Sequence, residues 1–205
     1  MKRLLLILTA FLLCGNAFAK SPIPGVRTEW GVVAGVNYMA PKFTMGDSSA
    51  SLKANPGFSA GIHMGLRIIG ILGIQPEVIY SYNKIGIEDD KVNFVSDIKC
   101  NTLQVPVLLS LKLALVRFNI GPVFTVMDNP TYLDRSGEKV MFGRLNPTLS
   151  YTAGVSVCLF KHLLIDARVA SGFKTVENCL SYDISHDQYI KTTMFNAQLK
   201  IGVLF

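Results

Sequence analysis

The chain has 205 residues, half of them hydrophobic, and its 20 basic and 14 acidic residues give a formal net charge of +6. This length suits one domain and is short for two. The charge is mild, and no basic run interleaved with aromatic residues is present, which argues against a nucleic acid as a partner.

The first nineteen residues predict a cleaved signal peptide. Lys2 and Arg3 give a positive start, residues 4–13 form an apolar run, and Ala17-Phe18-Ala19 matches an A-x-A cleavage site. The apolar run is shorter than the roughly 20 residues that a membrane-spanning helix needs. We therefore expect export across the inner membrane.

A lipoprotein signal is the alternative interpretation of the same segment, with Cys14 as the acylated residue. Leu13 stands before it, where such signals prefer a small residue. The predicted organisation is thus a signal peptide at 1–19 and one barrel domain at 20–205. Loss of Lys2 and Arg3 lowers the charge from +6 to +4.

Apolar and polar residues then alternate with a period of two in eight segments, which is typical of strands whose two faces meet different surroundings. The most apolar window, residues 103–120, contains six polar, charged or proline interruptions, so it does not predict a spanning helix. The predicted strands cover residues 30–38, 58–68, 72–83, 103–113, 117–126, 151–159, 163–170 and 195–205.

Charged side chains occur on only one face of these segments. A soluble barrel such as a lipocalin would enclose the apolar face and carry dense charge outside, whereas a transmembrane barrel reverses this order. Seven charges are too sparse for a soluble outer face, so we assign them to the lumen. The predicted lumen network consists of Arg67, Glu77, Lys112, Arg117, Asp166, Arg168 and Lys200.

The connections between the segments alternate strictly between short and long. Short links lie at 69–71, 114–116 and 161–162, and long links at 41–56, 84–101, 128–147 and 174–191. Outer-membrane barrels combine short periplasmic turns with longer extracellular loops. The pattern predicts an all-β, eight-stranded antiparallel up-and-down transmembrane barrel in the outer membrane of a Gram-negative bacterium. Its termini would be periplasmic, and outer-membrane lipid would surround it.

Two stretches resemble a known family. Leu103-Gln104-Val105-Pro106 and Phe118-Asn119-Ile120-Gly121-Pro122 are similar to the central hairpin of the PorT-like outer-membrane β-barrel family. The resemblance implies the same fold and location. The terminal strand ends in Phe205 and looks like the signal that the outer-membrane assembly machinery recognises, which implies that machinery as a partner. The family name points to secretion, and no residue here singles out that role.

An eight-stranded barrel is just wide enough for side chains to fill it. Apolar residues expected on the inward face would narrow the lumen further, so open diffusion is not expected. These residues are Val33, Met39, Ile79, Leu108, Phe160, Leu164 and Leu204.

Three small groups invite a chemical interpretation. His63 and Glu77 should face each other inside the barrel, but no nucleophile accompanies them, so we interpret His63 as a paired lumen histidine. Ser185-His186-Asp187 and Glu88-Asp89-Asp90 are expected to be solvated loops, because neither has the geometry or ligand spacing of a triad or calcium loop. We predict no catalytic residue, no cofactor and no metal.

Three cysteines follow residue 20. Cys100 and Cys179 lie towards the same end of the predicted barrel and could pair, whereas Cys158 lies inside near a short turn and should not.

The leading functional prediction is a non-enzymatic envelope, surface-binding or secretion-associated component, with envelope or secretion proteins as candidate partners. A small outer-membrane enzyme acting at the barrel rim and a narrow channel are the alternatives.

Overall fold

The computed structural model describes residues 26–44, 50–68, 71–89, 94–133, 139–141, 144–160, 162–174, 176–183 and 186–205. The predicted signal peptide lies outside these residues and stays a prediction. Within the described ranges, no helix is long and apolar enough to cross a membrane.

Eight long antiparallel strands close into a barrel. Their order is β1-β2-β3-β4-β5-β7-β8-β10, and pairing of β1 with β10 closes the circle. Two short strands extend this wall, because β6 pairs with β5 and β9 pairs with β10. The predicted fold class is confirmed. The bounds are β1 Val26–Thr44, β2 Ala50–Ile68, β3 Leu72–Asp89, β4 Phe94–Leu113, β5 Val116–Leu133, β6 Lys139–Met141, β7 Leu149–Leu159, β8 Leu163–Gly172, β9 Val176–Asp183 and β10 His186–Leu204.

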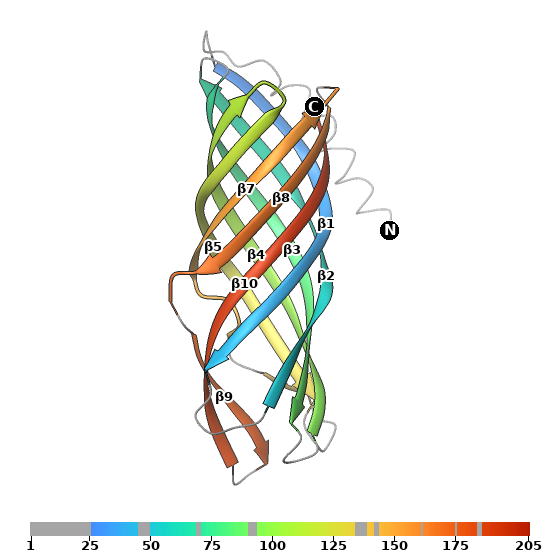
Figure 1. Cartoon of the computed structure of the whole chain (residues 1–205), viewed down its shortest axis with the longest axis vertical. Helices are drawn as coiled ribbons and strands as arrows, with labels where there is room; N and C mark the ends of the chain where they lie inside the picture. Colours follow the sequence, from blue (N-terminus) through green and yellow to red (C-terminus); the bar gives the residue numbers. More distant parts are fainter. Residues whose placement is uncertain are drawn as a thin grey trace.

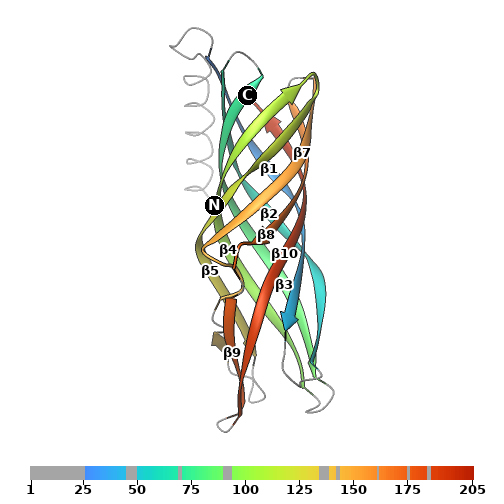
Figure 2. The same cartoon turned by 60° about the vertical axis from the view of Figure 1, so that its left-hand side comes forward.

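The two ends of the barrel differ. At one end, called the turn end, the short β2–β3, β4–β5 and β7–β8 connections gather with the start of β1 and the C-terminus (Figure 1). At the other, called the hairpin end, paired strands such as β9–β10 project well past the closed wall, as the turned view also shows (Figure 2). The terminal Phe205 is held at the turn end, where its N–H donates to the Trp30 carbonyl and its ring lies 4.9 Å from the Trp30 ring.

The long links are mostly strand, so the predicted loop ranges are wrong in extent. β3 and β4 stay paired from Lys84 opposite Lys99 to Asp89 opposite Phe94, inside the segment 84–101 predicted as a loop. The prediction treated polar composition as a loop signal. A hairpin in water needs no apolar face, because its backbone ladder and pairs such as Lys84–Asp97, 2.7 Å apart, can hold it.

The apolar face of the strands points outward and the polar face points into the barrel, as predicted for a transmembrane barrel. Large apolar side chains cover the outside, with Ile120 and Ile201 about 60% exposed, while polar side chains fill the inside. Among the apolar residues predicted to point inward, the prediction is wrong for Phe160. It is 87% exposed in the β7–β8 turn, where its positive φ of 51° ends the strand alternation. The other six are buried, namely Val33, Met39, Ile79, Leu108, Leu164 and Leu204.

Candidate functional site

A four-residue cluster around Glu77 occupies the barrel interior. Both Arg168 terminal nitrogens donate to the Glu77 carboxylate at 2.7 Å, and the Arg168 Nε lies 2.6 Å from Asp166 Oδ2. The Lys200 Nζ lies 3.4 Å from Glu77 and 3.6 Å from Asp166. Two carboxylates thus meet two cations, and all four side chains are at most 3% exposed. This Glu77 cluster is neutral, as buried charges ordinarily must be.

A second cluster forms nearer the turn end around Glu29, which our prediction missed. Arg67 Nη2 lies 2.5 Å from Glu29 Oε1, and both Arg117 terminal nitrogens donate to the Glu29 carboxylate. The missed signal was parity: Glu29 lies two residues before Gly31 and shares its inward face. The predicted first strand began one residue too late, at Trp30, to include it.

His63 joins the two clusters. It lies directly opposite Glu77 on the neighbouring strand, with Nδ1 3.1 Å from Glu77 Oε1 and Nε2 3.5 Å from Glu29 Oε1. Its side chain is fully buried. Both ring nitrogens of His63 therefore face carboxylates, as predicted for a paired lumen histidine.

Glycines make room for the long charged side chains. Glu29, Arg67, Arg168 and Lys200 each lie opposite a glycine on an adjacent strand, namely Gly65, Gly73, Gly154 and Gly35. A Cβ at any of these glycines would come within 2.5 to 2.9 Å of the Cγ of its charged partner. These four inward glycines thus leave the space that the charged side chains opposite them occupy.

Lys112 differs from the other six residues of the predicted network. It has the inward parity of β4, but it lies at the turn-end rim, is only half-buried, and makes no ion pair with a described residue. Arg67, Glu77, Arg117, Asp166, Arg168 and Lys200 are all buried and paired.

Residues 144–148, called the strap, lead into β7, and Leu145 and Asn146 within them are buried. Asp128 on β5 holds the strap: the Leu145 and Asn146 backbone N–H groups donate to Asp128 Oδ2 at 2.7 and 2.9 Å. The Asn146 amide nitrogen donates to Oδ1 at 2.8 Å. Leu145 is fully buried. The strap therefore forms part of the packed interior at this level.

Asp128→Ala should loosen the strap without unfolding the barrel. Removing an acceptor of three strap hydrogen bonds should lower the free energy of strap opening by about 1 to 3 kcal/mol. Trypsin cleavage after Arg144 in the folded protein should then be roughly tenfold faster. Asp97→Ala, which removes a carboxylate bonded to Lys84 on a hairpin, is the control and should leave this rate unchanged. Equal rates in all three proteins would show that Asp128 does not hold the strap.

Two small cavities lie inside the described barrel. One, lined by Asn146, Pro147, Met194 and Asn196 among others, has about 10 Å³, and another near Arg168 and Gln198 has about 10 Å³. Each has room for about one water molecule. At these two places the packed side chains leave no room for a solute larger than water.

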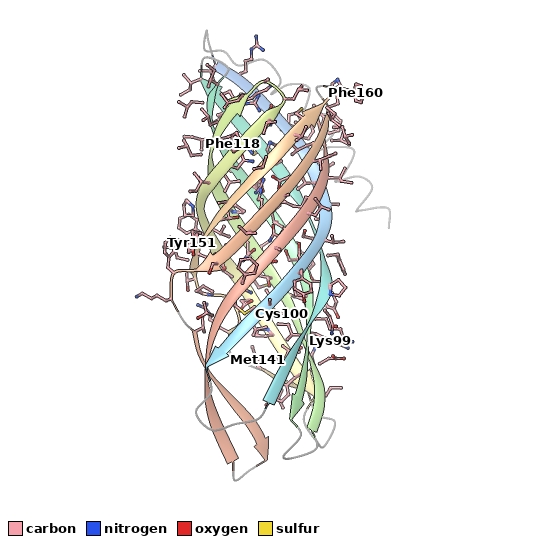
Figure 3. The ribbon with its side chains drawn as sticks, in the orientation of Figure 1. Lys99, Cys100, Phe118, Met141, Tyr151 and Phe160 are labelled. Carbon is pink, nitrogen blue, oxygen red and sulfur yellow. The ribbon has the colours of Figure 1, made fainter. Side chains whose placement is uncertain are left out.

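The remaining candidates are the cysteines and the two polar groups near the hairpin end. Cys100 and Cys158 are both free thiols, and the Cys100 Sγ lies 3.2 Å from Asp128 Oδ1. The side chains of Cys179, Glu88–Asp90 and Ser185–Asp187 lie outside the described residues. Among the described side chains, no group of three His, Cys, Asp or Glu residues could hold a metal ion. Figure 3 shows Cys100 towards the hairpin end and Phe160 at the turn end.

Comparisons with known proteins agree with this architecture. The family model described as "Outer membrane protein beta-barrel domain" matches residues 19–204. Neisserial surface protein A is 17% identical, with a TM-score of 0.54 over 85% of this chain and 96% of the other. Ail, the attachment invasion locus protein of Yersinia pestis, solved with the heparin analogue sucrose octasulfate, is 14% identical. Its TM-score is 0.51 over 87% of this chain and 99% of that chain. No curated protein matches.

Proposed function

The chain belongs to the outer membrane protein beta-barrel domain family, and on this premise we propose that it is a non-enzymatic anchor that presents its hairpin end to a partner outside the cell. As a member it is a protein of the Gram-negative outer membrane. The proposed orientation follows the rule that short turns of such barrels are periplasmic and long connections extracellular. Export by the signal peptide at 1–19 is part of the proposal.

The observation that carries the proposal is the unequal length of the two ends. Among the described residues, strand pairing continues beyond the outward apolar band at the hairpin end, for example through all of β9, from Val176 opposite Thr192 to Asp183 opposite His186. Extended hairpins on a rigid barrel are the usual way for a fold to display a binding surface. The filled interior supports a role as an anchor over a role as a channel.

The charge of the displayed segments bears on the partner. Ail was solved with a heparin analogue, which is a polyanion. In this chain the segments 41–56, 84–101, 128–147 and 174–191 together contain ten basic and eleven acidic residues. Such a balanced surface has no net attraction for a polyanion. We therefore propose a protein as the partner of the hairpin end.

A secretion component is a second form of the same proposal. It rests on the resemblance of residues 103–106 and 118–122 to the PorT-like family. An enzyme is less well supported, because His63 and Glu77 are buried and held in ion pairs.

The orientation predicts where trypsin can reach. Trypsin added to intact cells should cleave within 128–147, for example after Lys139, and should spare Lys161 in the β7–β8 turn. In broken cells Lys161 should become accessible. Peptide mapping by mass spectrometry measures both sites. Cleavage after Lys161 by trypsin added to intact cells would show that the barrel has the opposite orientation.

The role itself is tested by complementation. A strain lacking the gene should regain any lost surface or secretion phenotype with the wild-type gene, but not with a variant whose β9–β10 hairpin, residues 176–191, is replaced by a short turn. Purified wild type should give no conductance steps in planar bilayers and no hydrolysis of bilayer lipid. Full rescue by the trimmed variant, conductance or hydrolysis would each contradict the proposal.

A further inference from the structure

Four basic residues gather at the turn end. Arg27 is the second residue of β1, Arg67 the second from last of β2, Lys112 the second from last of β4, and Arg117 the second of β5. In the barrel register Arg27 lies directly opposite Arg67, and Lys112 directly opposite Arg117. Directly opposed residues of an antiparallel pair share a face, and like charges there repel and destabilise the sheet. Two such pairs at one rim need a compensating anion.

The chain supplies only part of that compensation. Glu29 is the one carboxylate that pairs with these residues in the described structure, and it serves Arg67 and Arg117 together. The side chains of Arg27 and Lys112 make no hydrogen bond or ion pair with a described residue. The Arg117 Nε is buried without a hydrogen-bond partner. The Glu77 cluster, with two carboxylates for two cations, shows that this barrel balances its charges elsewhere.

The imbalance is also visible in the whole chain. The four hairpin-end segments contain ten basic and eleven acidic residues, whereas the rest of residues 20–205 contains eight basic and only three acidic ones. Of those eight, Arg168 and Lys200 are neutralised in the Glu77 cluster. The other four that the structure describes, Arg27, Arg67, Lys112 and Arg117, lie at the turn end with a single acidic residue, Glu29.

We propose that the turn-end rim, formed by Arg27, Arg67, Lys112 and Arg117, is a binding site for a phosphate group presented from the periplasm. The four rim cations, two of which share the Glu29 carboxylate, leave three positive charges, which a multiply charged phosphate can neutralise. Guanidinium groups match phosphate oxygens through paired N–H donors, and the Lys112 ammonium adds a point charge. Access to this site from the periplasm depends on the proposed orientation, whereas phosphate binding itself does not.

The test uses the barrel of residues 20–205 folded in dodecyl maltoside, a detergent whose head group has neither charge nor phosphate. Calorimetric titration with pyrophosphate should show one site that weakens strongly as salt is raised. Lys112→Gln and Arg27→Gln should each weaken binding by about tenfold, and the double variant should abolish it. Lys84→Gln and Lys99→Gln, at the hairpin end, are matched controls and should bind as the wild type does.

Folding of each variant is checked by heat-dependent mobility in gel electrophoresis and by the fluorescence of Trp30, the single tryptophan. Arg27 and Lys112 lie at the rim and make no ion pair within the described structure, so their loss should not unfold the barrel. Two results would overturn the proposal: no pyrophosphate binding by the wild type, or binding that the double variant retains.

Native mass spectrometry separates the two sources of phosphate. Retention of phosphatidylglycerol but not phosphatidylcholine, lost in the double variant, would identify a lipid head group. Pyrophosphate binding without lipid retention would identify a free phosphate. A poly-glutamate peptide that binds at least tenfold more tightly than pyrophosphate through the same residues would identify an acidic protein segment instead and contradict the proposal. Because these measurements use detergent, they do not depend on the trypsin test of orientation.

Discussion

Glu77→Gln should lower the free energy of unfolding by about 3 to 5 kcal/mol, because it leaves buried cations without their partner. Glutamine has nearly the shape of glutamate, so the loss is one of charge. Glu77 accepts two hydrogen bonds from Arg168 and lies within 3.4 Å of Lys200 and 3.1 Å of His63. In the variant, Asp166 alone would face Arg168 and Lys200.

The measurement is reversible urea unfolding of the barrel in lipid vesicles, followed by Trp30 fluorescence. Asp97→Asn provides the control, since it breaks the Lys84–Asp97 pair, whose side chains are about 40% exposed. An exposed pair contributes only about 0 to 1 kcal/mol. If Glu77→Gln is no more destabilised than Asp97→Asn, the Glu77 cluster does not stabilise the barrel and its charges must be solvated.

The fold could be predicted because two independent patterns agreed. Alternation assigns each residue of a strand to one of the two faces. The strict alternation of short and long links indicates that strands consecutive in the sequence also pair in the sheet. Eight such strands, all with the same face apolar, can then close into a barrel by pairing β1 with β10. The facing of His63 and Glu77 followed from the same alternation across the short link at 69–71.

The details that could not be predicted depend on events at strand ends. Alternation weakens where a strand leaves the apolar band, so the paired extensions of β3 and β4 resembled loops. Phe160 has the parity of the inward face, but a positive φ in the turn sends its side chain outward. The Asp128 strap joins residues 17 and 18 positions apart through hydrogen bonds that carry no periodic signal.

The charged interior was partly visible in the sequence. The seven predicted residues all have inward parity, yet which carboxylate meets which cation depends on the register around the whole barrel. Arg117 reaches Glu29 from a strand 88 residues later in the chain. The pairing of each long charged side chain with a glycine, such as Arg168 with Gly154, likewise becomes visible only once strands are aligned.

The outward face should be tested where it is most apolar. Ile201 lies on β10 between Ala34 of β1 and Ile165 of β8, with 57% of its surface exposed. It lies near the middle of the span from Phe195 to Phe205, whose ten residue steps rise about 25 Å at a tilt of ~40°. Ile201→Arg should therefore lower the free energy of unfolding in vesicles by about 2 to 4 kcal/mol, because lipid cannot solvate a guanidinium.

The control for depth is Val203→Arg, two residues nearer the turn end on the same outward face. Its arginine can reach the interface, so its cost should fall towards about 0 to 1 kcal/mol. Ile201→Leu, which keeps the apolar surface, should cost less than about 1.5 kcal/mol. Urea unfolding of all three variants in the same vesicles gives the comparison. If Ile201→Arg is as stable as wild type, the apolar face does not contact lipid. The barrel would then have to bury that face against protein, because so large an apolar surface is not left in water.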